Sequence, residues 1–124
     1  MPSVLLVEDN ELILKSLEHV LAKDGFDVVA VKDGEEAMRA VAMFNYDVVI
    51  TDINMPNING LDLIQRLKAS EATSNVGIIV VSSLVNESSV LEALRLGADL
   101  FLPKPIKPYD LVLRVKKLVA EKMD

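Results

Sequence analysis

The sequence contains no cysteine and no tryptophan, and aromatic residues make up only 4% of it. Without cysteine the chain forms neither disulfide bonds nor thiolate metal sites, which fits a reducing compartment. No apolar stretch approaches the roughly 18 residues that a membrane-spanning helix needs. From these absences we expect a cytoplasmic location, no membrane association and a core built from aliphatic side chains.

Positive charge is also scarce, because 13 Lys and Arg residues stand against 19 Asp and Glu residues and give a formal net charge of -6. Nucleic acid backbones bind basic surfaces, so this balance argues against direct binding of DNA or RNA. Hydrophobic residues, by contrast, make up 51% of the 124 residues, which is ample for a single core. We therefore expect one domain over residues 1–124, with any DNA-directed role belonging to another domain or a partner.

Short apolar runs alternate with amphipathic segments along the whole chain, a pattern that predicts βα units around a parallel sheet. The runs are apolar on both faces, as expected for strands that helices cover on both sides. The expected strands are 3–7, 27–31, 47–52, 77–82 and 99–103. The expected helices are 11–23, a second that follows Asp33, about 60–69, 86–96 and a last one that begins at Pro108. The alternation ends with this fifth helix, so we expect no output domain within these residues.

Local signals mark the ends of several helices. Asp33 and Glu36 have the spacing of a capping box, which predicts the start of the second helix. Gly25 and Gly97 stand where C-terminal caps are expected. Four apolar residues of the second helix have the spacing of one buried face: Ala37, Ala40, Val41 and Phe44.

Polar residues stand at the ends of the apolar runs. In chain order they are Glu8, Asp9, Asp52, Ser82 and Lys104. Because the carboxyl ends of parallel strands share one edge of the sheet, these side chains should meet where open α/β sheets bind ligands. Carboxylates that crowd together need a cation among them, which predicts a hard divalent metal. A metal, a nucleophilic aspartate, a hydroxyl and a lysine are the groups needed to receive a phosphoryl group.

Asp52 is the strongest candidate for the nucleophile, because it ends an apolar strand and a carboxylate there can attack phosphorus to give an acyl phosphate. The alternative is a structural role, in which the aspartate side chain hydrogen-bonds to the backbone of its own turn. We assign Asp9 and Asp52 as direct ligands of Mg²⁺ or Mn²⁺, Glu8 as a ligand through water, and the backbone carbonyl of Asn54 as a further ligand. The alternative for Glu8 and Asp9 is a structural role at the start of a helix, where one residue caps the helix and the negative charge interacts favourably with the helix dipole.

Lys104 should lie over these carboxylates, where its ammonium can pair with Asp52 at rest and with phosphoryl oxygens afterwards. The alternative is a lysine that reaches into solvent. The bond between Lys104 and Pro105 is a candidate cis peptide, since cis is cheap only before proline. Ser82 is a candidate donor to the phosphoryl group, and Phe101, otherwise an ordinary core residue, is a candidate to move with it.

Taken together, these residues resemble the receiver domain of bacterial two-component response regulators. The matching stretches are 4–10, 47–56, 60, 79–83 and 96–99, followed by Lys104 and Pro105. The resemblance implies a flavodoxin-like, doubly wound α/β fold of three αβα layers, with a five-stranded parallel sheet in the order 2-1-3-4-5. It also implies magnesium-dependent phosphorylation of Asp52 by a sensor histidine kinase or a histidine phosphotransfer protein.

The resemblance further implies a switch. Phosphorylation draws Ser82 toward the acyl phosphate, Phe101 turns inward, and the face of the fourth helix, fifth strand and fifth helix repacks for a downstream output domain or protein, with a phosphorylation-dependent dimer as one outcome. The domain is then a phosphoacceptor and not an enzyme, with at most slow self-phosphorylation from small donors and slow autodephosphorylation. Leu84, an apolar residue near Ser82, should shield the acyl phosphate from water and prolong its life.

Two other functions are compatible with parts of the pattern. An aspartyl-phosphate phosphohydrolase of the haloacid dehalogenase type carries a second aspartate two residues after the nucleophile, but here that position is Asn54, which cannot act as a general acid. A docking module of the same fold that is never phosphorylated would not need all five of the acidic, hydroxyl and lysine groups. The complete set of these groups favours the phosphoacceptor.

Overall fold

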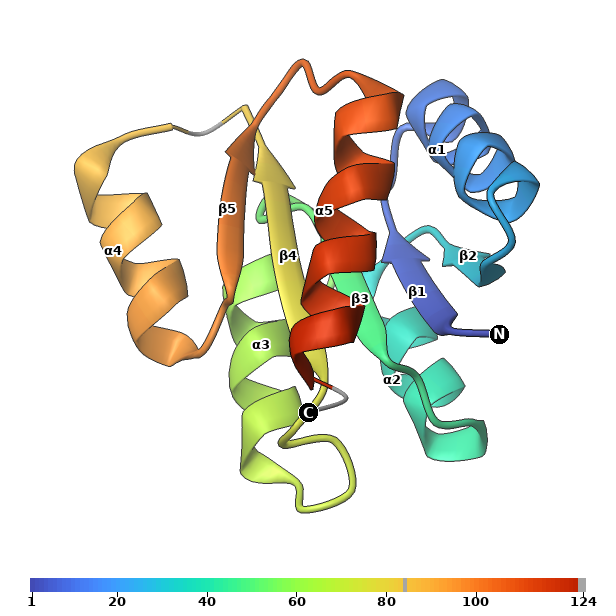
Figure 1. Cartoon of the computed structure of the whole chain (residues 1–124). Helices are drawn as coiled ribbons and strands as arrows, with labels where there is room; N and C mark the ends of the chain where they lie inside the picture. The colour runs from blue at the N-terminus through green and yellow to red at the C-terminus, as the bar shows by residue number, and fades with distance from the viewer. Residues whose placement is uncertain (84, 123–124) are drawn as a thin grey trace.

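The computed structural model describes residues 1–83 and 85–122, which form a five-stranded sheet between two layers of helices (Figure 1). The strands are β1 (Ser3–Val7), β2 (Asp27–Val31), β3 (Val48–Thr51), β4 (Gly77–Ser82) and β5 (Leu100–Pro103). The helices are α1 (Glu11–Lys23), α2 (Gly34–Met43), α3 (Gly60–Ala69), α4 (Glu87–Leu96) and α5 (Pro108–Lys122). All neighbouring strands are parallel, in the order β2-β1-β3-β4-β5. This confirms the predicted fold.

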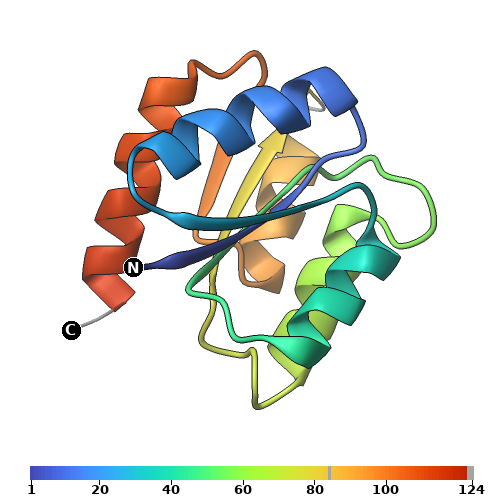
Figure 2. The ribbon, with the colours of Figure 1, turned by 90° about the vertical axis from the view of Figure 1, so that its right-hand side faces the viewer.

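Two hydrophobic cores lie on the two faces of the sheet because side chains alternate along each strand. Val4 and Leu6 of β1 pack into the core that α1 and α5 cover, whereas Leu5 and Val7 pack into the core that α2, α3 and α4 cover. Figure 2 shows α1 and α5 on one side of the sheet and the other three helices on the opposite side. The central strands are therefore buried on both faces and bring the ends of β1, β3 and β4 to a single rim.

The helix ends follow the predicted signals. The carboxylate of Asp33 accepts a hydrogen bond from Glu36 N at 2.8 Å, as a helix cap does. Gly25 and Gly97 adopt φ angles of 99° and 122°, a conformation that favours glycine. Within the described part of the chain, no helix combines the length and the apolar content that crossing a membrane requires.

The structure corrects the prediction at a few positions. Phe44 does not lie on the buried face of α2, because the helix ends at Met43 and Phe44 is its extended C-cap, 64% exposed. Helices do not cover both faces of β2, contrary to the prediction. This strand lies at the edge of the sheet and leaves Val29 40% exposed. The expected strands 47–52 and 99–103 are each slightly too long, and α4 begins at Glu87, after Asn86 as its cap.

Candidate functional site

Three charged side chains from three strands meet at the carboxyl rim of the sheet: Glu8 after β1, Asp52 after β3 and Lys104 after β5. Their backbones are tied to neighbouring strands, since Glu8 N donates to Val31 O at 3.1 Å and Lys104 N donates to Ser82 O at 2.9 Å. The sheet therefore fixes the backbone positions from which these side chains extend.

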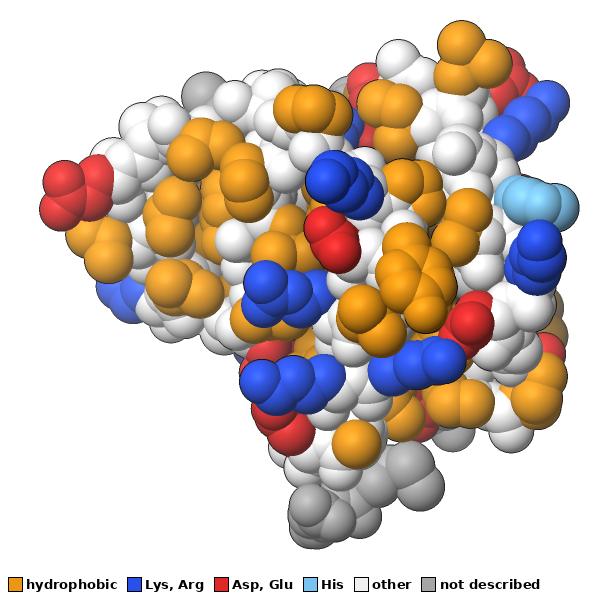
Figure 3. Space-filling model, turned by 45° about the horizontal axis from the view of Figure 1, so that its top comes forward, with side chains coloured by type: hydrophobic (Ala, Val, Ile, Leu, Met, Phe, Trp, Pro, Cys, Tyr) orange, Lys and Arg blue, Asp and Glu red, His pale blue; other side chains and the backbone are white. Residues whose placement is uncertain are grey.

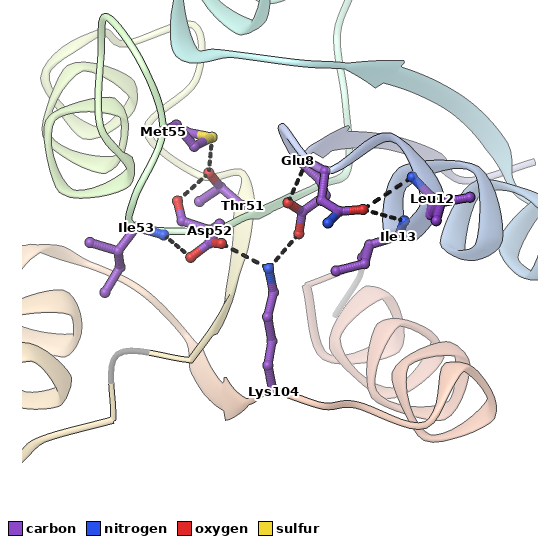
Figure 4. A network of polar contacts seen from close by, with 9 residues as sticks. Glu8, Leu12, Ile13, Thr51, Asp52, Ile53, Met55 and Lys104 are labelled. Atoms are coloured by element: carbon purple, nitrogen blue, oxygen red, sulfur yellow. Dashed lines mark hydrogen bonds and ion pairs between the residues drawn. The ribbon is translucent and has the colours of Figure 1, made fainter.

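The Lys104 ammonium bridges the two carboxylates. Its Nζ lies 2.6 Å from Glu8 Oε1 and 2.8 Å from Asp52 Oδ2 (Figure 4). Glu8 is only 3% exposed and Asp52 only 8% exposed, so these carboxylates need a close cation. Burial by itself lowers the pKa of Lys104, but hydrogen bonds and charge from Asp52 and Glu8 outweigh it and raise that pKa overall. Lys104 is therefore a fixed positive charge in this site.

The remaining carboxylate oxygens are held by the backbone. Asp52 Oδ1 accepts from Ile53 N at 2.6 Å, and Glu8 Oε2 accepts from Asn10 N at 3.0 Å. Asn10 in turn caps α1, because its Oδ1 accepts from the first backbone N–H groups of that helix. Both buried carboxylates consequently have a defined orientation.

A third carboxylate completes an acidic cluster. Asp9 is exposed, and one oxygen each from Glu8, Asp9 and Asp52 lies within 4.8 Å of the others. Three carboxylates at this separation are a donor set that suits a hard divalent cation such as Mg²⁺. Asn54 lies two residues beyond Asp52 in the exposed β3–α3 loop. Its role as a carbonyl ligand stays a prediction.

The two residues predicted to respond to a phosphoryl group lie on β4 and β5. Ser82 is fully buried at the end of β4, and Phe101 is half-buried opposite Val80. Since Ser82 and Val80 are two residues apart, they share the face of the sheet on which Phe101 packs. The bond between Lys104 and Pro105 is cis. The prediction about Leu84 falls on a residue outside the described part of the chain.

The first residue of α3 lies directly against the backbone of Asp52. Gly60, the first residue of α3, donates its N–H to Ile53 O at 2.8 Å. A Cβ at this position would lie 2.0 Å from the carbonyl oxygen of Asp52, so no larger residue fits without movement. Glycine at position 60 therefore lets α3 start directly against the peptide of Asp52.

Sequence reasoning missed two contacts in this site. It placed Lys104 over the carboxylates and named Asp52 as its partner, but did not name Glu8, which binds the same ammonium. It also read Thr51 as part of an apolar strand, whereas the buried Thr51 hydroxyl donates to the Asp52 carbonyl at 2.8 Å. A hydroxyl residue next to the last position of an otherwise aliphatic run was the signal for this contact.

Comparisons with known proteins show which family the chain belongs to. The response regulator receiver domain family matches residues 4–116. The chain is 35% identical over 115 residues to the uncharacterized transcriptional regulatory protein YcbL of Bacillus subtilis, covering 93% of the chain and 50% of YcbL. It is 36% identical over 121 residues to the transcriptional regulatory protein PrrA of Mycobacterium tuberculosis, covering 98% of the chain and 51% of PrrA.

A solved structure is similar over its whole length. The receiver domain of the Francisella response regulator 1452 superposes with a TM-score of 0.91 at 30% identity, covering 98% of each chain. The chain therefore belongs to the receiver-domain family of two-component response regulators, whose members are phosphoacceptors rather than catalysts. It spans about half the length of the curated relatives it matches.

Proposed function

We propose that this chain accepts a phosphoryl group on Asp52 from a sensor histidine kinase or a histidine phosphotransfer protein. The observation that carries the proposal is the Lys104 ammonium, which bridges Asp52 and Glu8 inside a cluster of three carboxylates. An aspartate with a purely local role in its turn would not need this arrangement.

The acidic cluster is the proposed cation site. Asp9, Asp52 and the carbonyl of Asn54 would bind Mg²⁺ or Mn²⁺ directly, and Glu8 would bind it through water. When bound, such an ion neutralises charge on phosphoryl oxygens. Glu8 is already held by Lys104 and by Asn10 N, which supports an indirect contact for its carboxylate.

The transfer needs few groups, since phosphoryl transfer depends on positioning and electrostatics. A carboxylate oxygen of Asp52 attacks the phosphorus of a phosphohistidine; the new P–O bond forms while the P–N bond breaks, and the imidazole leaves with the electron pair. In the unphosphorylated site the Lys104 ammonium lies 2.8 Å from Asp52 Oδ2. After transfer it pairs with the phosphoryl oxygens. Ser82 donates its hydroxyl to the same group. Small phosphodonors would react slowly in place of the protein donor, and loss of the phosphoryl group to water would also be slow.

The proposed output surface consists of α4, β5 and α5. Phe101 is part of β5, and Ser82 ends the neighbouring strand β4. Leu91 and Leu94 of α4 are 58% and 43% exposed, and Figure 3 shows hydrophobic side chains gathered over α4 at the left of the view. Exposed apolar residues on a single element are typical of a protein-binding surface. An output domain, a separate protein or a second copy could bind there.

The test is the intact mass of the protein after incubation with acetyl phosphate, with and without Mg²⁺. We expect one phosphoryl adduct that depends on Mg²⁺, is removed by hydroxylamine and is absent from Asp52→Asn. Asp62→Asn is the matched control, because Asp62 is an exposed aspartate in the first turn of α3. An absence of adduct under every condition would instead favour a docking module that is never phosphorylated.

A further inference from the structure

Thr51, the last residue of β3, has a hydroxyl that no predicted role uses. The residue is 1% exposed, and its Oγ1 lies 2.8 Å from the carbonyl oxygen of Asp52 and 3.7 Å from the sulfur of Met55 (Figure 4). A hydroxyl has one proton, so the short contact to the carbonyl is the main hydrogen bond and the sulfur is a weaker acceptor. Thr51 thereby contacts the nucleophile's own peptide and the loop beyond it.

The carbonyl of Asp52 needs this partner. β3 ends at Thr51, so Asp52 lies outside the regular hydrogen bonding of the sheet. Its N–H donates to Val7 O at the long distance of 3.4 Å. No backbone N–H of the described residues donates to the Asp52 carbonyl. Gly60 packs directly against this oxygen and leaves little room for another donor. A buried carbonyl without a donor is costly, so the Thr51 hydroxyl fixes the orientation of this peptide.

The two contacts of Thr51 bracket the short segment that carries the proposed chemistry. Asp52 supplies the nucleophile, Asn54 supplies the proposed carbonyl ligand, and Met55 is the residue whose sulfur contacts Thr51. We propose that the Thr51 hydroxyl is a positioning group that sets the peptide of Asp52 and the following loop for cation binding and phosphoryl transfer. This inference rests on the proposed function of Asp52.

Two substitutions at position 51 test the proposal. Thr51→Val keeps the branched shape and removes the hydroxyl, while Thr51→Ser keeps the hydroxyl. We expect Thr51→Val to weaken Mg²⁺ binding, measured by calorimetry, and to slow phosphorylation by acetyl phosphate, each by roughly tenfold, which corresponds to one lost hydrogen bond. Thr51→Ser should restore both values to near those of the wild type.

A second readout follows the nucleophile directly. The amide proton of Ile53, which donates to Asp52 Oδ1 at 2.6 Å, should shift upfield in the NMR spectrum of Thr51→Val and return in Thr51→Ser. Thr73→Val is the matched control, because it removes a comparable hydrogen bond elsewhere. Thr73 follows α3, and its hydroxyl donates at 2.6 Å to the carbonyl of Leu67 in the last turn of that helix. We expect Thr73→Val to leave Mg²⁺ binding, phosphorylation and the Ile53 signal unchanged.

Each outcome decides the proposal. It is overturned if Thr51→Val binds Mg²⁺ and gains phosphate like the wild type, or if Thr51→Ser is as impaired as Thr51→Val. It is also overturned if Thr73→Val has the same effect, since the loss would then reflect general destabilisation. A wild type that binds Mg²⁺ but forms no adduct would refute the proposed function, and Mg²⁺ affinity and the Ile53 signal would still decide the role of Thr51.

Discussion

At the scale of single residues, three charged side chains of the site, Glu8, Asp52 and Lys104, have defined hydrogen-bond partners. Glu8, Asp52 and Lys104 could be predicted because each is a charged residue that interrupts or ends an aliphatic run. The role of Thr51 could not, because threonine is β-branched and fits a buried strand as valine does. Only the three-dimensional structure shows that its hydroxyl reaches a carbonyl outside the sheet. The sequence equally cannot show that Glu8 and Asp52 share the ammonium of Lys104.

Replacing Lys104 by methionine should destabilise the fold by about 2–3 kcal/mol, because two buried carboxylates lose their shared cation. The pKa of Lys104 is raised, so this stabilisation is complete below the ordinary lysine pKa of about 10.4 and is lost as the pH rises through the higher folded value. Urea unfolding of both proteins should therefore show a constant difference from pH 7 to about 10 that narrows above it.

Lys117→Met is the control for this measurement, because Lys117 is an exposed lysine of α5. Its free energy of unfolding should stay within about 0.5 kcal/mol of the wild type at every pH. A difference for Lys104→Met that already disappears between pH 7 and 9 would contradict the raised pKa.

At the scale of elements, helix boundaries were predictable where a specific residue ends or begins them. The ranges 11–23 and 60–69 and the start at Pro108 agree with α1, α3 and α5. The prediction failed for Phe44 because periodicity alone does not reveal where α2 stops, and one residue beyond the helix the side chain turns to solvent. It failed for the outer face of β2 because strand order, which the local pattern does not contain, decides which strand lies at the edge.

The start of α3 lies directly against the peptide of Asp52. We expect Gly60→Ala to destabilise the protein by about 2–3 kcal/mol, because the added methyl group would overlap the rigid carbonyl of Asp52. Under the proposed function it should also slow phosphorylation, since relief of the overlap moves either α3 or the peptide of Asp52. Thermal unfolding and the rate of adduct formation measure the two effects.

Gly77→Ala provides the comparison. A Cβ there would first meet the end of the Leu118 side chain, which can rotate away, at 2.9 Å. This variant should therefore be less destabilised than Gly60→Ala and should be phosphorylated at the wild-type rate. Equal losses in the two proteins would mean that the contact between α3 and Asp52 has no special role.

At the scale of the whole molecule, the acidic cluster joins the ends of β1 and β3, so a bound cation should stabilise the complete fold. At a Mg²⁺ concentration ten times its dissociation constant, we expect about 1.4 kcal/mol of added stability and a melting temperature about 5 °C higher. Chelation with EDTA should reverse the change. Differential scanning calorimetry measures it.

Two variants locate the cation that causes this rise in melting temperature. Asp9→Asn removes one carboxylate of the cluster and should remove most of the stabilisation by Mg²⁺. Asp62→Asn, which lies outside the cluster, should keep it. If both variants respond to Mg²⁺ like the wild type, the cation binds at another place.

The ion pair between Glu8 and Lys104 spans 96 residues of sequence, and this separation has a consequence for protein synthesis. A growing chain that has emerged only as far as Asp52 carries all three carboxylates of the acidic cluster but does not yet contain Lys104. Domains generally fold as units, so under the proposed function a chain that still lacks β5 and Lys104 should not accept a phosphoryl group.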